Sequence, residues 1–305
     1  MDLVSIVIPT LDRPEPLKRA LASALSQEAP KVEREIVVVD NSATGSARAT
    51  VEAAGPGVRY LPVPTPGVAT ARNAGVRAAA GRWVAFLDDD QEAFPGWLAG
   101  HVAAARASGA DATFGPAEAR ADGGGSLGPF GPFFSREIDR PDAVDVTDLC
   151  AYLGTNNSMF DKARCLGGAE PFDPALNAVG GEDSLLLKRL VASGRRFAYA
   201  REARVLEWTP PRRLTWAYVK KRRFLSGQIR SFVLDMMDPP RRAEIAWWMA
   251  VGAVQAAAGG ALAVAFAPID RERSQKALAT AYGGLGKVLW MKRFRPSLYG
   301  PGLVS

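Results

Sequence analysis

The sequence is poor in the residues that build disulfide frameworks and zinc centres. Among 305 residues it has two cysteines, Cys150 and Cys165, and one histidine, His101. A disulfide-rich secreted domain is therefore excluded, as is a zinc site made of Cys and His. A Ser-His-Asp triad would have to use His101, the one histidine of the chain. We expect His101 to be an ordinary residue on a helix surface, and any metal to be bound mainly by oxygen ligands.

Glycine-rich phosphate-binding loops are also missing. A dinucleotide-binding fold places Gly-x-Gly-x-x-Gly after its first strand, whereas the segment Pro9–Pro14 of this chain has the sequence PTLDRP. No P-loop motif occurs elsewhere. A bound nucleotide would therefore not be held by a glycine cradle. Nucleotidyl transfer to a sugar phosphate, which would need such a loop with Arg and Lys, is disfavoured for the same reason.

The overall composition is that of a globular protein, but the charge is unevenly distributed. Apolar residues make up 48% and charged residues 23% of the chain, and the length suits one large or two small domains. Residues 1–200 carry a net charge of −5, whereas residues 201–305 have 18 Lys/Arg and 7 Asp/Glu, a net charge of +11. A basic C-terminal third favours contact with nucleic acid or an anionic membrane. We expect no signal peptide, because Met1–Val4 leads directly into an apolar strand.

Apolar runs and helical spacing alternate along the first third of the chain. The pattern predicts strands at Val4–Pro9, Glu35–Val39, Val58–Leu61 and Trp83–Leu87, and helices at Pro14–Ser26, Ala47–Ala54, Val68–Ala80 and Pro95–Ser108. Strands that alternate with helices over short connections predict an α/β fold with a mostly parallel, doubly wound sheet.

The later elements are less regular. We predict strands at Asp111–Arg120 and Thr155–Phe160, one or two strands within Arg196–Glu207, and helices at Glu182–Ser193 and Leu214–Met237. Ala121–Pro132 is rich in Gly and Pro, which predicts a mobile loop. Because Pro239 and Pro240 then break the chain, we expect a catalytic domain over residues 1–238 and a helical tail over residues 239–305.

Acidic residues follow three of the predicted strands. Thr10 and Asp12 follow the first strand, Asp40 the second, and the run Asp88–Asp90 the fourth. Ligands of open parallel sheets bind beyond the carboxyl ends of the strands, so these groups should share one rim. Carboxylates that converge repel one another unless a cation is bound, which favours Mg²⁺ or Mn²⁺ bridging to ligand phosphates. Helix capping by these aspartates is the alternative, above all for Asp40.

Five motifs occur in an order and spacing that resemble a known family. They are VSIVIPT at 4–10, VVDNS at 38–42, TARNAG at 70–75, FLDDD at 86–90 and GGED at 180–183. Together they resemble family 2 glycosyltransferases of the GT-A fold, over roughly residues 3–232. The segment Val205–Trp208, followed by Pro210, Pro211 and Arg213, resembles the succinoglycan-biosynthesis branch of that family.

The resemblance implies a role for each motif in an inverting sugar transfer. Nucleotide contacts would come from Pro9, Thr10, Asp12, Arg13, Asp40, Arg72, Asp88 and Asp89. Asp40 would accept the imide N–H of uracil, which favours UDP over guanine or thymine nucleotides. Asp88 and Asp90 would bind the metal, with Asp90 the main contact. Glu207 stands where many relatives carry a histidine that completes the coordination. Its alternative is a surface ion pair with Arg212 or Arg213.

Two adjacent carboxylates are candidates for the chemical step. The resemblance implies that Asp183 is the general base, and a carboxylate can take the proton of a hydroxyl as that hydroxyl attacks. Glu182 beside it would raise its proton affinity through like charge. A metal would stabilise the leaving nucleoside diphosphate. Alternatively, both acids only complement the dipole at a helix N-terminus.

Four further residues are expected near the sugars. Asn156 and Asn157 would hydrogen-bond sugar hydroxyls, unless they only form a turn. Arg222 and Arg223 would contact the donor or acceptor, for instance at a diphosphate, unless they belong to a solvated basic face.

The C-terminal segment favours a membrane surface. Ile245–Ala267 has no charged residue over 23 positions, and arginines and tryptophans lie at or near its ends. It is long enough to span a bilayer, but its many alanines and three glycines make insertion marginal. We expect a helix that lies in or re-enters the membrane at the cytoplasmic face of a bacterial inner membrane. A spanning helix and an ordinary core helix are the alternatives.

A membrane location would suit a polyprenyl-diphosphate-linked glycan acceptor, besides the nucleotide-diphospho-sugar donor. Tryptophans beside an uncharged run fit lipid better than nucleic acid, so no nucleic-acid partner is expected. The competing functional hypothesis is a catalytically silent protein that keeps this fold as a membrane-surface binding module.

Overall fold

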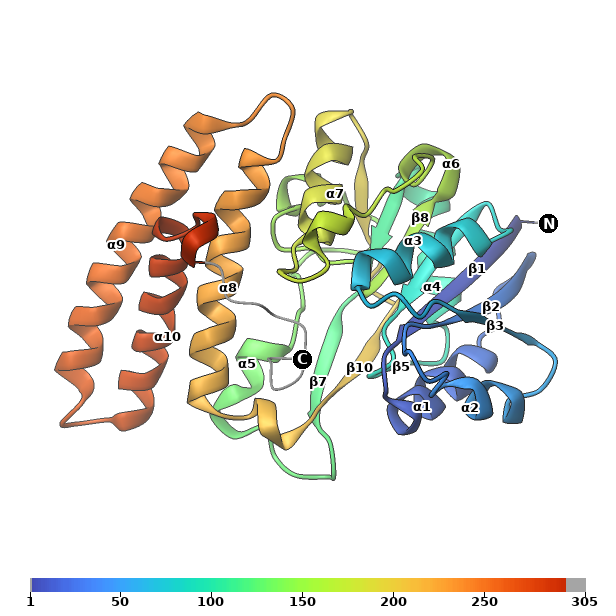
Figure 1. Ribbon diagram of the computed structural model, residues 1–305, viewed down its shortest axis with the longest axis horizontal. Coiled ribbons are helices and arrows are strands. Elements are labelled where there is room, and N and C mark those ends of the chain that lie inside the picture. Colours follow the sequence, from blue (N-terminus) through green and yellow to red (C-terminus); the bar gives the residue numbers. More distant parts are fainter. Residues whose placement is uncertain (1, 295–305) are drawn as a thin grey trace. The chain divides into compact units, whose positions relative to one another are not determined.

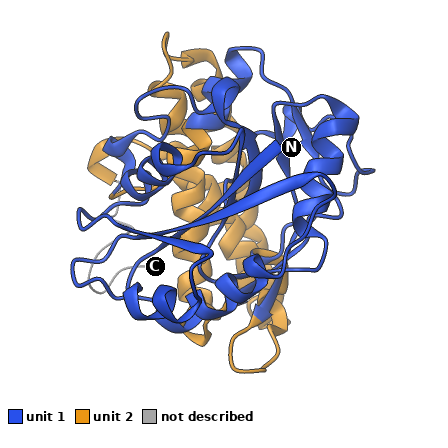
Figure 2. Cartoon of the chain, turned by 90° about the vertical axis from the view of Figure 1, so that its right-hand side faces the viewer, with its two compact units in different colours: residues 1–120, 134–177, 186–208 blue, residues 121–133, 178–185, 209–305 orange. Residues whose placement is uncertain are grey.

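The computed structural model describes residues 2–294 and divides into two compact units (Figure 2). The first, here called the sheet unit, contains the residues up to 120 together with 134–177 and 186–208. The second, here called the helical unit, contains residues 121–133, 178–185 and those from 209 onward.

A seven-stranded sheet forms the centre of the sheet unit (Figure 1), in the order β3-β2-β1-β4-β8-β6-β9. Its strands are β1 (Asp2–Thr10), β2 (Val32–Asp40), β3 (Val58–Pro62), β4 (Trp83–Leu87), β6 (Ala112–Phe114), β8 (Asn157–Asp161) and β9 (Phe197–Tyr199). Only β8 runs antiparallel to its neighbours β4 and β6. The predicted mostly parallel α/β sheet is confirmed.

The register of the first strands aligns their carboxyl ends. Thr10 pairs with Asp40 across β1 and β2, and Val7 pairs with Phe86 across β1 and β4. Thr10 and Asp89 each lie three residues beyond the Val7–Phe86 pair, so they come level at the same edge of the sheet. The predicted rim of polar residues follows directly from this register.

Helices cover both faces of the sheet. They are α1 (Pro14–Leu25), α2 (Arg48–Ala53), α3 (Val68–Ala78), α4 (Trp97–Ser108), α6 (Lys162–Cys165) and α7 (Glu182–Ala192). Apolar residues of α1 and α4, such as Leu17 and Trp97, belong to one buried cluster, and residues of α3 and α7, such as Val76 and Leu187, belong to another. Burial on both faces explains why β1 and β4 are continuous apolar runs.

The segment predicted as one strand at Asp111–Arg120 is two strands in different sheets. β6 belongs to the large sheet, whereas β7 (Ala117–Ala121) belongs to a three-stranded sheet with β5 (Gln91–Ala93) and β10 (Val205–Thr209). The chain changes sheet at Gly115 and Pro116. A side chain at Gly115 would overlap the carbonyl oxygen of Ala203, and Pro116 has no N–H to continue a ladder. The single-strand prediction is therefore wrong.

The Gly- and Pro-rich segment Ala121–Pro132 is not a featureless loop. It contains the 3₁₀ turn η1 (Gly128–Phe130) and leads into the short helix α5 (Gly131–Phe134). The rings of Phe130 and Phe133 pack against Trp216, with centroids 5.0 Å and 5.9 Å away. These aromatic contacts fix a segment that composition alone marked as mobile.

His101 is fully buried in α4, contrary to the expected surface position. Its Nδ1 lies 2.9 Å from Thr113 Oγ1, and its Nε2 lies 3.1 Å from Asn157 Oδ1. Burial lowers its pKa to about 4, so the ring is neutral in the folded protein. Two polar partners from distant strands make this burial possible.

The helical unit is built on three helices that lie side by side (Figure 1). They are α8 (Trp216–Asp235), α9 (Arg242–Phe266) and α10 (Arg271–Val288). Glycines allow close packing: a Cβ at Gly252 of α9 would lie 2.6 Å from the carbonyl oxygen of Gly284 on α10. The last of these helices, α10, ends at Val288, before the 3₁₀ turn η5 (Lys292–Phe294). Within residues 2–294, α9 is the one helix long and apolar enough to cross a membrane.

Candidate active site

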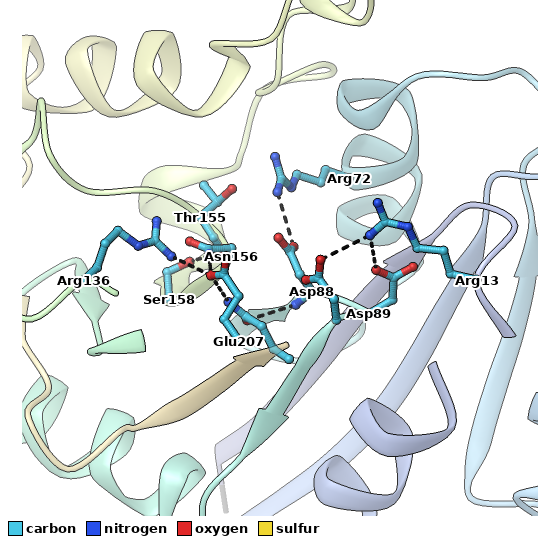
Figure 3. Close-up of polar contacts among 11 residues, drawn as sticks. Arg13, Arg72, Asp88, Asp89, Arg136, Thr155, Asn156, Ser158 and Glu207 are labelled. Carbon is cyan, nitrogen blue, oxygen red and sulfur yellow. Dashed lines mark hydrogen bonds and ion pairs between the residues drawn. The ribbon is translucent and has the colours of Figure 1, made fainter. Parts of the chain in front are cut away.

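The three consecutive aspartates after β4 form the centre of the candidate site (Figure 3). Thr10 at the end of β1 donates a hydrogen bond of 2.7 Å from Oγ1 to Asp89 Oδ2. Arg13, just before α1, lies between two of the aspartates, with Nη1 3.2 Å from Asp89 Oδ1 and 3.2 Å from Asp90 Oδ2. The sequence prediction that these residues meet at one rim is confirmed.

The third aspartate has its own arginine. Arg72 Nη2 on α3 lies 3.4 Å from Asp88 Oδ1. Arg72 is largely buried, and its guanidinium lies over the ring of Phe172 at 5.8 Å. The neighbouring Asn73 exchanges two hydrogen bonds with the backbone of Phe172, at 2.7 Å and 3.0 Å. The TARNAG motif therefore fixes an arginine that reaches the end of β4.

Burial and like charge make the ionised form of the aspartate cluster unfavourable. Burial raises the pKa of Asp89 to about 7, against the lowering effect of Arg13 and with a further rise from Asp90. Burial also raises the pKa of Asp88, against the lowering effect of Arg72. The pKa of Arg13 is raised, because Asp89 and Asp90 outweigh its own desolvation. Additional positive charge at this rim would relieve the cluster.

Glu207 lies in a second polar group beside the aspartates (Figure 3). Its Oε2 is 3.3 Å from Asn156 Nδ2, 3.5 Å from Gln91 Nε2 and 3.6 Å from Arg136 Nη2. Gln91 also accepts a hydrogen bond of 3.2 Å from the backbone N–H of Asp88. Glu207 is therefore linked to the metal-candidate loop through Gln91. Glu207 also forms an ion pair with Arg136, a residue that the sequence alone did not indicate.

Sequence reasoning missed several residues that support this arrangement. Arg136 had no signal in its surroundings, whereas Gln91 directly follows the aspartate run. Asn177 also escaped notice: its Oδ1 accepts from the backbone N–H groups of Ala69 and Thr70 at 3.0 Å and 3.2 Å, which caps the start of α3. The helix that carries Arg72 is thus held by a residue more than a hundred positions away.

Of the two expected sugar-binding asparagines, only Asn156 faces the Glu207 group. Asn157 is buried, and its Oδ1 is 2.7 Å from Trp97 Nε1, while its Nδ2 donates to the carbonyls of Pro116 and Ala203 at 2.9 Å and 2.8 Å. His101 Nε2 lies 3.1 Å from the same Oδ1, so both polar atoms of the Asn157 amide have partners within the core. Asn157 therefore stabilises the fold where the large and small sheets meet.

Asp40 is completely buried at the end of β2. It accepts hydrogen bonds from the N–H of Ser42 at 3.0 Å, the N–H of Ala47 at 2.9 Å and the hydroxyl of Tyr60 at 2.9 Å. Desolvation alone would raise its pKa, but these bonds outweigh it and hold the pKa below the usual value. Asp40 thus holds the turn that leads into α2 without capping that helix, and a role in uracil recognition stays a prediction.

The loop between β1 and α1 supplies the remaining predicted nucleotide contacts. Pro9 lies within β1, and Asp12 is exposed in a left-handed conformation with φ 54°. Aspartate tolerates that conformation better than most residues, so the turn brings Arg13 back toward the aspartates at modest cost.

The proposed base lies in the helical unit. Asp183 and Glu182 form the first turn of α7, preceded by Gly180 and Gly181 with φ of 75° and 93°. Only glycine adopts such angles without strain, which explains the Gly-Gly pair. Glu182 is buried, whereas Asp183 is half-buried and accepts a 2.6 Å hydrogen bond from the N–H of Ser184. Arg222 and Arg223 are exposed on α8 of the same unit.

The aspartates after β4 can hold a divalent cation only together with ligands from outside the protein. Among residues 2–294, no three His, Cys, Asp or Glu side chains converge as a ready-made metal site. Magnesium and manganese sites in nucleotide-dependent enzymes commonly use one or two carboxylates and take their other ligands from phosphates and water. Asp88 and Asp90 match that donor set. A bound cation would compete with Arg13 and Arg72 for these carboxylates, and bound phosphates would compete with the carboxylates for the two arginines.

A GT-A-type sheet whose fourth strand ends in an aspartate cluster defines a class of nucleotide-sugar transferases, and comparison with known sequences agrees. The family model for glycosyl transferase family 2 matches residues 5–161. The succinoglycan biosynthesis protein ExoM of Rhizobium meliloti is 32% identical over 240 residues, which cover 76% of this chain and 75% of that protein. ExoO of the same organism is 32% identical over 210 residues, or 64% of this chain and 57% of that protein. The chain belongs to glycosyltransferase family 2.

Solved structures show the same fold. The mannosyltransferase PcManGT from Pyrobaculum calidifontis, in complex with GDP-Man and Mn²⁺, has a TM-score of 0.63 at 20% identity and covers 95% of this chain and 87% of that chain. Residues 1–349 of S. aureus TarS give a TM-score of 0.57 at 16% identity, and the match covers 98% of this chain and 99% of that chain. TarS has also been solved with UDP and with UDP-GlcNAc. The GT-A fold expected from the motifs is confirmed.

Proposed function

We propose that this protein is an inverting, metal-dependent glycosyltransferase. It moves a sugar from a nucleotide-diphospho-sugar, with UDP the preferred nucleotide, to a hydroxyl of a glycan or lipid-linked glycan in bacterial polysaccharide or glycolipid biosynthesis. The observation that carries the proposal is the aspartate cluster after β4, where Thr10, Arg13 and Arg72 converge on Asp88, Asp89 and Asp90.

The comparisons support the finer parts of this proposal. The relatives ExoM and ExoO are named for succinoglycan biosynthesis, which supports a polysaccharide or lipid-linked glycan as the acceptor. TarS has been solved with UDP and UDP-GlcNAc, which supports a UDP-sugar donor. PcManGT binds GDP-Man with Mn²⁺, which supports a divalent metal and keeps guanine as the second nucleotide to test.

Residues of the rim bind the donor. Asp88 and Asp90 hold the cation, with Glu207 beside them, and the cation when bound offsets the charge of the diphosphate. Arg13 and Arg72, freed from the aspartates, pair with the diphosphate oxygens. Asp40 and the Thr10–Asp12 turn contact the nucleoside, and Asn156 contacts a sugar hydroxyl.

Asp183 acts on the acceptor. Its carboxylate takes the proton from the acceptor hydroxyl while that oxygen attacks the anomeric carbon, and the bond to the diphosphate breaks on the opposite side. The single displacement inverts the configuration. Glu182 is buried next to Asp183 in the first turn of α7.

The enzyme works at an anionic membrane, at the cytoplasmic face where lipid-linked acceptors would be found, and its helical unit makes the contact. The apolar helix α9, which is uncharged from Ile245 onward, and the net charge of +11 over residues 201–305 support this location.

Calorimetry of UDP and GDP binding, with and without Mn²⁺, tests the proposal. Wild type should bind UDP more tightly with Mn²⁺, and Asp90→Ala should lose that gain. The matched control Asp139→Ala removes an exposed aspartate and should keep it. Equal metal-dependent binding in wild type and Asp90→Ala would reject the metal assignment. Donor binding without any sugar transfer or donor hydrolysis would support the silent binding module instead.

A further inference from the structure

Two cations from different helices of the helical unit contact one tryptophan. The guanidinium carbon of Arg230, on α8, lies 4.8 Å from the ring centroid of Trp248 on α9. The ammonium nitrogen of Lys287, on α10, lies 5.6 Å from the same centroid. Three adjacent helices therefore bring an aromatic ring and two positive charges together at one level.

A third cation belongs to the same surface. Arg223 precedes Arg230 by seven residues, about two helical turns, so both lie on one face of α8. Gly227 lies between them, and a Cβ there would come within 3.0 Å of the backbone nitrogen of Lys287. Lys287 therefore enters the cluster between the two arginines.

These cations repel one another. Desolvation, followed by the charges of Arg230 and Arg223, lowers the pKa of Lys287 to about 8. Desolvation and Arg230 likewise lower the pKa of Arg223. A fold that keeps partly desolvated like charges in contact gains stability when an anion binds among them.

Two carboxylates of the adjacent helices have ion-pair partners on their own helix turns. Glu244 of α9 pairs with Arg241 at 2.7 Å, and Glu272 of α10 pairs with Lys276 at 2.6 Å. Trp247, which directly precedes Trp248 on α9, is 65% exposed. Positive charge next to an exposed apolar side chain fits an anionic group that carries a hydrocarbon chain.

We propose that Arg223, Arg230 and Lys287 form a binding site for the diphosphate group of a lipid, with Trp248 holding the cations in place. The ligand class rests on the proposed function, because a lipid-linked diphosphate is the acceptor carrier suggested there. The sequence already predicted that Arg223 contacts a diphosphate. The proposal adds Arg230 and Lys287, which no motif indicated. The arginines pair with phosphate oxygens through their planar N–H groups, and the lysine adds a point charge.

The test measures vesicle binding by the full-length protein at fixed ionic strength. The probes are phosphatidylcholine vesicles that contain polyprenyl diphosphate, and matched vesicles in which phosphatidylglycerol supplies the same negative charge. Lys287→Met removes the charge and keeps an apolar side chain of similar length. Lys276→Met makes the same exchange on the same helix, at an exposed lysine outside the cluster. Arg230→Gln is the second site variant.

Wild type should prefer the diphosphate vesicles by at least tenfold, and Lys287→Met and Arg230→Gln should each lose most of that preference. Lys276→Met should keep it. Soluble pyrophosphate should compete only weakly, because it lacks the hydrocarbon chain. Equal binding of both vesicle types by wild type, equal losses in Lys287→Met and Lys276→Met, or tighter binding of pyrophosphate than of vesicles would overturn the proposal.

Thermal stability separates a binding role from a structural one. If the cluster serves a ligand, Lys287→Met should melt at a higher temperature than wild type, because a repelled and partly desolvated cation is gone. A lower melting temperature together with unchanged vesicle preference would mean that Lys287 only supports the fold. Calorimetry of UDP with Mn²⁺ on the same variants should match wild type. Failure of wild type itself to bind UDP would count against the proposed function, not against this site.

Discussion

Single residues at the rim divide into those that bind and those that hold the binding groups. Arg13 and Arg72 contact the aspartates directly, whereas Asn73 and Asn177 fix the helix that carries Arg72. A substitution in the first pair should weaken donor binding with little loss of stability. A substitution in the second pair should cost stability, because buried N–H and carbonyl groups would be left without partners.

Asp183 is the residue whose substitution should separate chemistry from binding. Asp183→Asn keeps the shape of the side chain and removes its basicity. Turnover should fall by roughly two to four decades, the usual contribution of a general base. The affinity for UDP with Mn²⁺ should change little. Glu182→Gln is the matched variant, and it should lower turnover less, because Glu182 acts only through Asp183.

Steady-state kinetics together with calorimetry decide this prediction. If Asp183→Asn keeps wild-type turnover and Glu182→Gln loses it, the role of base passes to Glu182.

The buried His101 predicts an acid-sensitive fold. Its pKa is about 4 in the folded protein and about 6.5 when unfolded, so the unfolded chain takes up a proton first as the pH falls. The stabilising effect of the neutral ring is complete above pH 6.5 and is lost between pH 6.5 and pH 4, by up to about 3 kcal/mol. His101→Gln cannot titrate. Urea unfolding at pH 7 and at pH 4.5 should show a smaller loss for the variant than for wild type, and equal losses would contradict the buried neutral ring.

At the scale of elements, glycine decides how α9 and α10 pack. A Cβ at Gly252 would lie 2.6 Å from the Gly284 carbonyl oxygen, and a Cβ at Gly259 would lie 2.8 Å from that of Ala277. The face of α9 that bears these glycines is therefore committed to α10. Its opposite face carries exposed apolar residues such as Val254 and Val264, which are 68% and 76% exposed. That second face remains available to a lipid surface or another protein.

Two glycine substitutions on α9 test this packing. Gly252→Ala should destabilise the helical unit by about 1–3 kcal/mol, because the added methyl group has no room. Gly260→Ala meets nothing within 4 Å and should stabilise it by about 0.5–1 kcal/mol through helix propensity. Thermal or denaturant unfolding of both variants measures the difference. Effects of the same sign would show that the two helices do not pack as described.

At the scale of the whole molecule, the uneven charge predicts salt-dependent membrane binding. The C-terminal third carries a net charge of +11, and each basic residue near an anionic surface contributes on the order of 1 kcal/mol. The full-length protein should co-sediment with anionic vesicles, and high salt should remove the electrostatic part. Val254→Glu, on the exposed face of α9, should remove the part that resists salt. Wild type that stays in solution with anionic vesicles would remove the main support for a membrane location.

Point substitutions are better suited to this question than removal of the tail. Ending the chain near Pro239 would delete α9 and α10, and the α8 surface around Gly227 and Gln228 that packs on α10 would be exposed. A truncated protein would therefore lose stability as well as any membrane contact, and the two effects would not be separable.

The sequence by itself determined the sheet and its polar rim. Continuous apolar runs define β1 and β4, and because parallel strands end at a common edge, Thr10 and the aspartates of FLDDD had to meet there. Five ordered motifs were enough to identify the family. Such features are local in the chain, which is why periodicity and spacing reveal them.

Only the tertiary structure decided which polar side chains face inward. His101 and Asn157 are buried because partners far away in the sequence complete their hydrogen bonds, and Glu207 pairs with Arg136, which is also distant in the sequence. The division of Asp111–Arg120 between two sheets depends on the approach of Ala203 to Gly115. No local pattern encodes contacts of this kind, because the free energy of burying a polar group depends on what packs around it.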